Sequence, residues 1–178
     1  MSQVPAADAE SAQVRLEPAR YEWLDALAVG DQVFSDRFGI TVVPGWVGFP
    51  EALPVALAAA RAVDADRWGS HLIFDTDQAL VGFGGFKGAP VDDAVEIGYA
   101  IAPERQGRGL ATAATEIMIE RARAEGVRLI VAHTLGESNP STSVLTHCEF
   151  TRVATLMDDD LGSEVWRWEL DISRPSAV

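Results

Sequence analysis

Residues 96–111 read EIGYAIAPERQGRGLA, and this stretch indicates the order of elements at the centre of the fold. The apolar run at residues 94–102 predicts a strand, which Pro103 ends. Beyond the loop, apolar residues recur at helical spacing on one face, at Leu110, Ala114, Ile117 and Met118. Gly126 is well placed to end that helix. The segment is therefore predicted to run from strand through a glycine-containing loop into a helix.

This order of elements is the arrangement that an anion-binding site needs. The first turn of a helix leaves backbone N–H groups without partners, and the helix dipole adds partial positive charge there. Gly107 and Gly109 let a phosphate approach the backbone closely, while Arg105 and Arg108 add positive charge. The loop is not a P-loop, because no Gly-Lys-Ser/Thr follows, and its glycines lack the spacing of the dinucleotide fingerprint. A plain glycine turn is the simpler alternative, but the patterned strand and helix on either side disfavour it.

Along the rest of the chain, the predicted helices lie mostly in the N-terminal part and the predicted strands mostly after them. Helices are predicted at 21–29, from Asp31 onward and at 51–63, with a glycine- and proline-rich loop at 39–50. Strands are predicted at 13–16, 71–75, 79–86, 128–132, 152–157 and around Trp166 to Leu170, with a short helix at 142–147. We therefore expect an α+β (mixed α/β) fold with a mostly antiparallel, twisted mixed sheet flanked by helices. One domain is expected at 13–172, between tails at 1–12 and 173–178.

The composition excludes several classes of function. With 14 Lys and Arg against 27 Asp and Glu, the formal net charge of −13 argues against a nucleic-acid binder. The acidity is compatible with a cationic substrate, although solubility explains it more simply. No apolar run approaches the roughly 20 residues that span a bilayer, and the first residues do not resemble a signal peptide, so a cytoplasmic protein without membrane partners is expected. A single cysteine, Cys148, and three histidines show no zinc-ligand spacing, which predicts no metal.

Two motifs resemble one family. QGRGLA at 106–111 fits the Gln/Arg-x-x-Gly-x-Gly/Ala signature of the GNAT acetyltransferases, with Gln106, Gly109 and Ala111 at the signature positions. The wider stretch resembles the RimJ/RimL-like subgroup, named for ribosomal-protein N-terminal acetyltransferases. Downstream, AHTLGESNPSTSVLTHCEF at 132–150 is similar to that subgroup's strand end, asparagine and short helix. Glu149 stands where a glycine is usual, and Thr142 where serine is common.

The resemblance implies acetyl-CoA as co-substrate and assigns residues to it. The backbone that would cradle the pyrophosphate comprises Gln106, Gly107, Arg108, Gly109, Leu110 and Ala111. The strand at Tyr99, Ala100 and Ile101 would hydrogen-bond the pantetheine arm, and Asn139 would contact this arm from the other side. A backbone N–H near Ile101 is then a candidate to polarise the thioester carbonyl.

The acceptor amine must lose a proton before it attacks. At pH 7 this costs about 4–5 kcal/mol for a lysine amine but only about 1–1.5 kcal/mol for an α-amino group. Glu96, on the strand that leads to the cofactor, is the first candidate for the base, with a solvent-facing glutamate as the plain alternative. His133 at a strand end is a second candidate. Thr142, Ser141 or Ser143 could protonate the leaving thiolate, or could cap the helix instead.

We therefore predict an N-acetyltransferase that moves acetyl from acetyl-CoA to a primary amine by direct attack in a ternary complex. The acceptor would be a protein N-terminus or a small, cationic amine, and a homodimer is compatible with this reading. Trp46 and Phe49 of the 39–50 loop either line the acceptor pocket or pack into the core. The alternative from another class is a non-catalytic acyl-CoA-binding or sensor module of the same fold, because fold alone does not guarantee activity.

Overall fold

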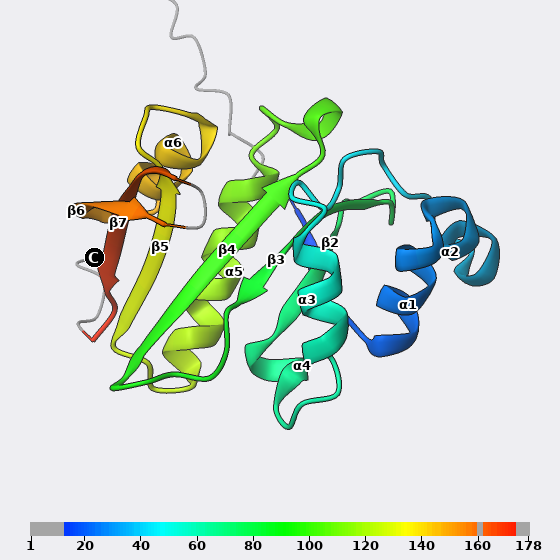
Figure 1. Ribbon diagram of the computed structural model, residues 1–178, viewed down its shortest axis with the longest axis horizontal. Helices are drawn as coiled ribbons and strands as arrows, with labels where there is room; N and C mark the ends of the chain where they lie inside the picture. Colours follow the sequence, from blue (N-terminus) through cyan, green and yellow to red (C-terminus); the bar gives the residue numbers. More distant parts are fainter. Residues whose placement is uncertain (1–12, 160–161, 174–178) are drawn as a thin grey trace, which may run out of the picture.

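The computed structural model describes residues 13–159 and 162–173, and the two predicted tails fall outside this part of the chain except for Ser173. Its centre is a seven-stranded sheet of order β1-β2-β3-β4-β5-β7-β6 (Figure 1). The strands are β1 (Arg15–Pro18), β2 (Ser70–Phe74), β3 (Leu80–Phe86), β4 (Ala94–Ile101), β5 (Leu129–Leu135), β6 (Thr151–Asp158) and β7 (Ser163–Asp171). Neighbouring strands run antiparallel except β4 and β5, which are parallel and joined through α5. The predicted α+β class is confirmed.

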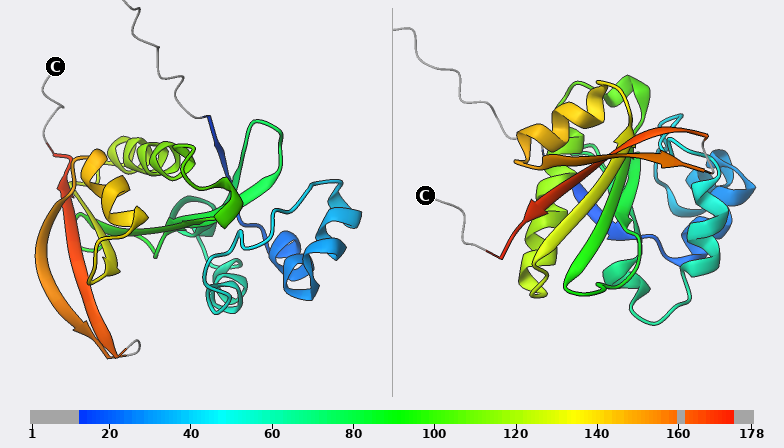
Figure 2. Two further views of the ribbon diagram at one scale, coloured as in Figure 1. Left: turned by 90° about the horizontal axis from the view of Figure 1, so that it is seen from above. Right: turned by 60° about the vertical axis from the view of Figure 1, so that its left-hand side comes forward.

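Helices cover both faces of the sheet. They are α1 (Tyr21–Val29), α2 (Asp31–Phe38), α3 (Ala52–Ala59), α4 (Ala65–Trp68), α5 (Leu110–Ala124) and α6 (Pro140–His147), with a 3-10 turn at Pro103–Arg105. The left view of Figure 2 shows α5 and α6 on one side of the sheet and α1 to α3 on the other. In the same view β6 and β7 bend toward the side of α1 to α3. This side of β4 and β5 therefore lies between the bent strands and the N-terminal helices.

Alternation along the strands divides the core into two clusters. Ile97, Ile101 and Ile130 pack with Leu110 and Met118 of α5 on one face. On the other face, Phe74, Leu80 and Phe83 of the sheet pack with Leu24 of α1 and Phe34 of α2. The 39–50 loop joins this cluster through Trp46. Because successive side chains of a strand point to opposite faces, the residues of β4 that turn away from α5 are Glu96, Gly98 and Ala100.

The helix predicted at 51–63 is shorter in the structure, and α4 was not predicted. α3 ends at Ala59, whose carbonyl accepts the Ala62 N–H at 2.9 Å in a turn. Asp64, with a left-handed φ of 64°, separates this turn from α4, because an α-helix cannot continue through that conformation. Trp68 at the end of α4 packs on Phe86, with ring centroids 5.1 Å apart.

Burial of His71 in β2 predicts a loss of stability in acid. The side chain is 1% exposed, and its Nδ1 lies 3.0 Å from the Gly69 carbonyl oxygen. Burial, helped by the charge of Arg121, lowers the pKa of His71 from 6.5 to about 4. Between these two pH values the unfolded chain binds a proton at His71 and the folded protein does not. The contribution of His71 to the unfolding free energy is therefore fully present above pH 6.5 and is lost as the pH drops toward 4.

We expect the wild type to lose roughly 2–3 kcal/mol more unfolding free energy between pH 7 and pH 4.5 than His71→Gln does. Urea unfolding of both proteins at the two pH values measures this difference. Carboxyl groups titrate in both proteins and cancel in the comparison. Equal losses in the two proteins would contradict the assignment.

Candidate active site

The parallel strands β4 and β5 separate within their length. Their pairing runs from Ala94 opposite Leu129 to Ile97 opposite Ala132 and then stops, although both strands continue (Figure 1). β4 keeps its partner β3 on the other edge as far as Ile101. Among residues 13–159 and 162–173, no strand lies on the β5 side of β4 from Gly98 to Ile101, the stretch that contains the predicted pantetheine strand. An extended ligand can add to such an edge as a strand would.

The predicted anion loop lies at the carboxyl end of the same strand. The Gln106 side chain donates a hydrogen bond to the Ile101 carbonyl, at 2.9 Å, and ties the loop to β4. Gly107 and Gly109 have φ of 73° and 75°, a conformation that L side chains rarely adopt. α5 begins directly afterwards at Leu110, so its unpaired N–H groups face the loop. Gln106, Gly107, Arg108 and Gly109 are exposed and accessible to a ligand.

The two arginines of this loop have different environments. Arg108 is exposed and donates to the Glu104 carbonyl at 3.3 Å. Arg105 instead turns toward Asp75, with Nε 3.5 Å from Oδ2, and both side chains are largely buried. Asp75 also accepts from the backbone N–H groups of Asp77 and Ala79, both at 3.0 Å. Arg105 therefore anchors the loop to the β2–β3 turn, and Arg108 is the arginine left to meet an anion.

The first turn of α6 holds the second group of predicted residues. Asn139 and Thr142 form a reciprocal capping box: the Asn139 side chain accepts from the Thr142 N–H at 3.1 Å, and the Thr142 hydroxyl accepts from the Asn139 N–H at 3.2 Å. The Thr142 hydroxyl also donates to the Asn139 carbonyl at 2.8 Å. Ser141 offers its carbonyl to the Tyr99 hydroxyl at 3.3 Å, which places this turn beside β4. Ser143 is exposed.

Tyr99 and Cys148 lie in the apolar layer beneath this turn. Burial, reinforced by the neighbouring Cys148, raises the pKa of the Tyr99 hydroxyl above its usual range. Burial likewise raises the pKa of the Cys148 thiol to about 11. A buried, protonated thiol is a poor nucleophile, so Cys148 is a packing residue.

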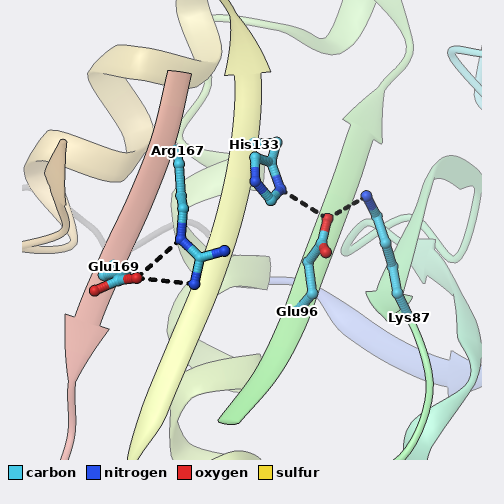
Figure 3. A network of polar contacts seen from close by, with 5 residues as sticks. All are labelled: Lys87, Glu96, His133, Arg167 and Glu169. Atoms are coloured by element: carbon cyan, nitrogen blue, oxygen red, sulfur yellow. Dashed lines mark hydrogen bonds and ion pairs between the residues drawn. The ribbon is translucent and has the colours of Figure 1, made fainter. Parts of the chain in front are cut away.

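A row of polar side chains crosses the opposite face of the sheet, away from α5 (Figure 3). The Glu96 Oε1 atom lies 3.0 Å from His133 Nδ1 and also accepts a hydrogen bond from the Lys87 ammonium. Further along the row, Arg167 contacts Glu169 through Nε and Nη2, each 2.9 Å from Oε1. Glu96 belongs to β4, His133 to β5 and Arg167 to β7, where Arg167 lies opposite His133, so three neighbouring strands place charged or titratable side chains on this face. The sequence indicated Glu96 and His133 as separate candidates but gave no sign of their contact.

The environment keeps Glu96 ionised. Burial opposes the charge of its carboxylate, but hydrogen bonds from Lys87 and His133 outweigh burial and hold the pKa of Glu96 below its usual value. Lys87 was missed in the sequence, although a signal existed. β3 and β4 pair as a hairpin in which Phe86 lies opposite Ile97. The next residue, Lys87, therefore lies opposite Glu96, and its backbone N–H donates to the Glu96 carbonyl at 2.9 Å.

The 39–50 loop borders the same face. Trp46 is 2% exposed, packs edge-on against Phe83 and donates from Nε1 to Asp31, so it belongs to the core. Phe49 is 60% exposed and remains available to a ligand. Gly48, with φ of 70°, lies so close to Ala100 of β4 that a Cβ added there would overlap with the Ala100 side chain. The loop thus rests directly on the strand that carries Glu96.

The separated parallel strands, followed by a glycine loop at a helix N-terminus, form an opened sheet edge of the kind to which an extended, anionic ligand can add. Residues 13–151 match the family described as "Acetyltransferase (GNAT) domain", and the chain belongs to this family. The predicted family is therefore confirmed. Among curated protein sequences, none matches the chain significantly.

Solved structures with a similar fold include relatives whose names agree with the predicted subgroup. RimJ from Mycobacterium smegmatis, in complex with CoA-disulfide, is 21% identical, with a TM-score of 0.67 over 94% of this chain and 86% of that one. The ribosomal-protein-S5-alanine acetyltransferase from Vibrio fischeri is 16% identical, with a TM-score of 0.62 over 93% and 97%. The putative acetyltransferase yncA from Salmonella typhimurium, with acetyl-CoA, is 17% identical, with a TM-score of 0.63 over 94% and 98%. At these identities the likeness establishes the fold.

In the described residues, no helix has both the length and the apolar character needed to cross a membrane. Within the same residues, no cluster of three or more His, Cys, Asp or Glu side chains has the arrangement of a metal site.

Proposed function

We propose that the protein is an acetyl-CoA-dependent N-acetyltransferase that acts on a primary amine in a ternary complex. One observation carries the proposal: the hydrogen-bonded pair of Glu96 and His133 sits where β4 and β5 separate. On one side of this point lies an unpaired strand edge and a glycine loop suited to a cofactor. On the other side lies a polar face suited to an acceptor.

The cofactor part of the proposal rests on backbone groups. The N–H groups from Gln106 to Ala111 would bind the pyrophosphate, with Arg108 adding charge. The edge at Tyr99 to Ile101 would bind the pantetheine arm, and Asn139 would contact it from α6. The presence of CoA-disulfide and acetyl-CoA in the RimJ and yncA structures supports this cofactor.

The acceptor part of the proposal uses the polar face. The base is the Glu96–His133 pair, which can receive a proton from an incoming amine. Thiolate release needs little help, because an ordinary thiol has a pKa of about 8.5. Ser141 and Ser143 are the better donors to it, because the Thr142 hydroxyl already donates to the Asn139 carbonyl.

The acceptor is proposed to be a protein N-terminus or a small cationic amine. The smaller cost of deprotonating an α-amino group favours the N-terminus. The names of two kinds of structural relative, the S5-alanine acetyltransferase and the spermidine N-acetyltransferase from Vibrio cholerae, support the two classes. This spermidine N-acetyltransferase is 16% identical, with a TM-score of 0.65 over 90% of this chain and 95% of that one.

An acceptor screen tests the proposal. The purified protein with acetyl-CoA should release free thiol when an accepted amine is added, from a panel of peptides with free N-termini, polyamines and aminosugars. Thiol reagents suit the assay, because Cys148 is buried and holds its proton. Acetyl-CoA should also raise the melting temperature by mass action. Stabilisation without thiol release on any amine would favour the non-catalytic acyl-CoA-binding module instead.

A further inference from the structure

Glu96 and His133 lie on either side of the last paired residues of β4 and β5. The pairing ends at Ile97 and Ala132, so Glu96 precedes the separation by one residue and His133 follows it by one. Both side chains point away from α5, toward the proposed acceptor side (Figure 3). The His133 side chain is 25% exposed. Among the described residues nothing hydrogen-bonds its second ring nitrogen, Nε2, which leaves that atom for a ligand.

An imidazole and a carboxylate differ in their ability to hold a proton. Moving a proton from an α-amino group, with a pKa of about 8, to an ordinary imidazole, at about 6.5, is disfavoured by roughly 30-fold. Moving it to a carboxyl group whose pKa lies below 4.5, as that of Glu96 does, is disfavoured by more than ~10³-fold. Glu96 is therefore a good partner for a cation and a poor resting place for the proton.

We propose that Nε2 of His133 accepts the proton of the amine, and that Glu96 is a positioning residue that orients the ring through Nδ1. This division of roles rests on the proposed function. The ammonium form of the acceptor first gives a proton to Nε2, and the neutral nitrogen then bonds to the acetyl carbon. The C–S bond breaks with its electron pair on sulfur, and the thiolate takes up the second proton, which the nitrogen releases on acylation. The resulting imidazolium is neutralised by Glu96. Lys87, bonded to the same carboxylate oxygen, keeps Glu96 ionised.

The charged neighbours of His133 are consistent with this role. Glu96 faces the ring from β4, and Arg167 occupies the position opposite His133 on β7. Beyond these two lie Lys87 and Glu169. Glu169 is bonded twice to Arg167, and this pairing reduces the effect of the guanidinium on the ring. The nearest charge to the ring is thus the Glu96 carboxylate, which it shares with Lys87.

The pH dependence of kcat/KM tests the assignment with an amine from the acceptor screen. The kcat/KM of the wild type should fall at low pH, where a protonated ring cannot accept the proton of the amine. This fall is the acid limb of the pH profile. His133→Gln should lose about 10²-fold or more in kcat and should lose this limb. Glu96→Gln should move the limb to lower pH and Lys87→Met to higher pH, each by up to about one pH unit, since the two substitutions remove charges of opposite sign. His147→Gln, which replaces an exposed histidine of α6, should match the wild type.

Opposite displacements of the limb cannot arise from a merely structural role. Stabilisation by acetyl-CoA should persist in every variant, which checks that each one folds. An NMR titration of the ring follows the same displacements without turnover, and His133→Gln assigns the resonance. Two results would overturn the role of His133 but leave the proposed function standing. One is a wild type that turns over while His133→Gln keeps the same acid limb. The other is a ring titration that Glu96→Gln does not move. Absence of turnover on every amine overturns the proposed function, and the assignment falls with it.

Discussion

Gly109→Asp is expected to weaken acetyl-CoA binding by about 10²–10³-fold. Gly109 is the residue before α5 and has φ of 75°, so its replacement stands at the mouth of the N–H groups that would hold the pyrophosphate. A carboxylate placed there occupies the same donors and repels the phosphates. Asp tolerates the left-handed conformation better than most residues, so the fold should survive. Calorimetric titration with acetyl-CoA measures the loss.

Gly126→Asp provides the matched control at the other end of α5. Gly126 has φ of 77°, and a Cβ there would meet open space. The variant therefore has the same substitution, the same added charge and nearly the same backbone conformation. It should bind acetyl-CoA within about twofold of wild type, although its charge lies at the negative end of the helix dipole and should cost up to about 1 kcal/mol of stability. Equal binding by the two variants would contradict a pyrophosphate site at residues 106–111.

Gly48→Ala is expected to lower the unfolding free energy and to raise KM for the amine, because it pushes the 39–50 loop away from β4. A Cβ at Gly48 overlaps with the side chain of Ala100. Overpacking costs about 1–3 kcal/mol, and an alanine with φ of 70° adds about 1 kcal/mol of backbone strain. The displaced loop should also raise KM for the amine, since it borders the acceptor face, and should leave acetyl-CoA binding intact. Urea unfolding and steady-state kinetics measure both effects.

Two further variants isolate the contact between Gly48 and Ala100. Gly39→Ala places alanine at φ of 68° with open space around it, so it should lose only the strain. Combining Gly48→Ala with Ala100→Gly removes the overlapping methyl group and should recover the stability lost to overpacking. A double variant no more stable than Gly48→Ala alone would show that the loop does not rest on Ala100.

The segment from β4 to α5 could be predicted because its signals are local. An apolar run, a proline, glycines and a helical repeat each act over a few residues, and β4, the loop and α5 lie where they were predicted. The resemblance to the GNAT signature added the pyrophosphate role, which stays a prediction. The start of α6 was placed two residues late because Pro140 and its cap, Asn139, form the first turn.

The polar face could not be predicted, because it depends on strand order. Glu96 and His133 are 37 residues apart and meet only because β4 and β5 are parallel neighbours in one register. The burial of Arg105 against Asp75 likewise depends on where the β2–β3 turn lies relative to the loop. Residue type indicated which side chains can exchange protons, and the sheet determined which of them meet. The roles assigned to Glu96, Thr142, Ser141 and Ser143 remain predictions.

Mass spectrometry of an amine acceptor tests directly whether the protein transfers acetyl from acetyl-CoA to an amine. After incubation with acetyl-CoA and the protein, an N-terminal peptide or polyamine should gain the mass of one acetyl group on its amine. The gain should require both acetyl-CoA and protein, and Gly109→Asp should reduce it strongly while Gly126→Asp does not. An acceptor panel that stays unmodified, with a protein that acetyl-CoA demonstrably stabilises, would contradict the claim.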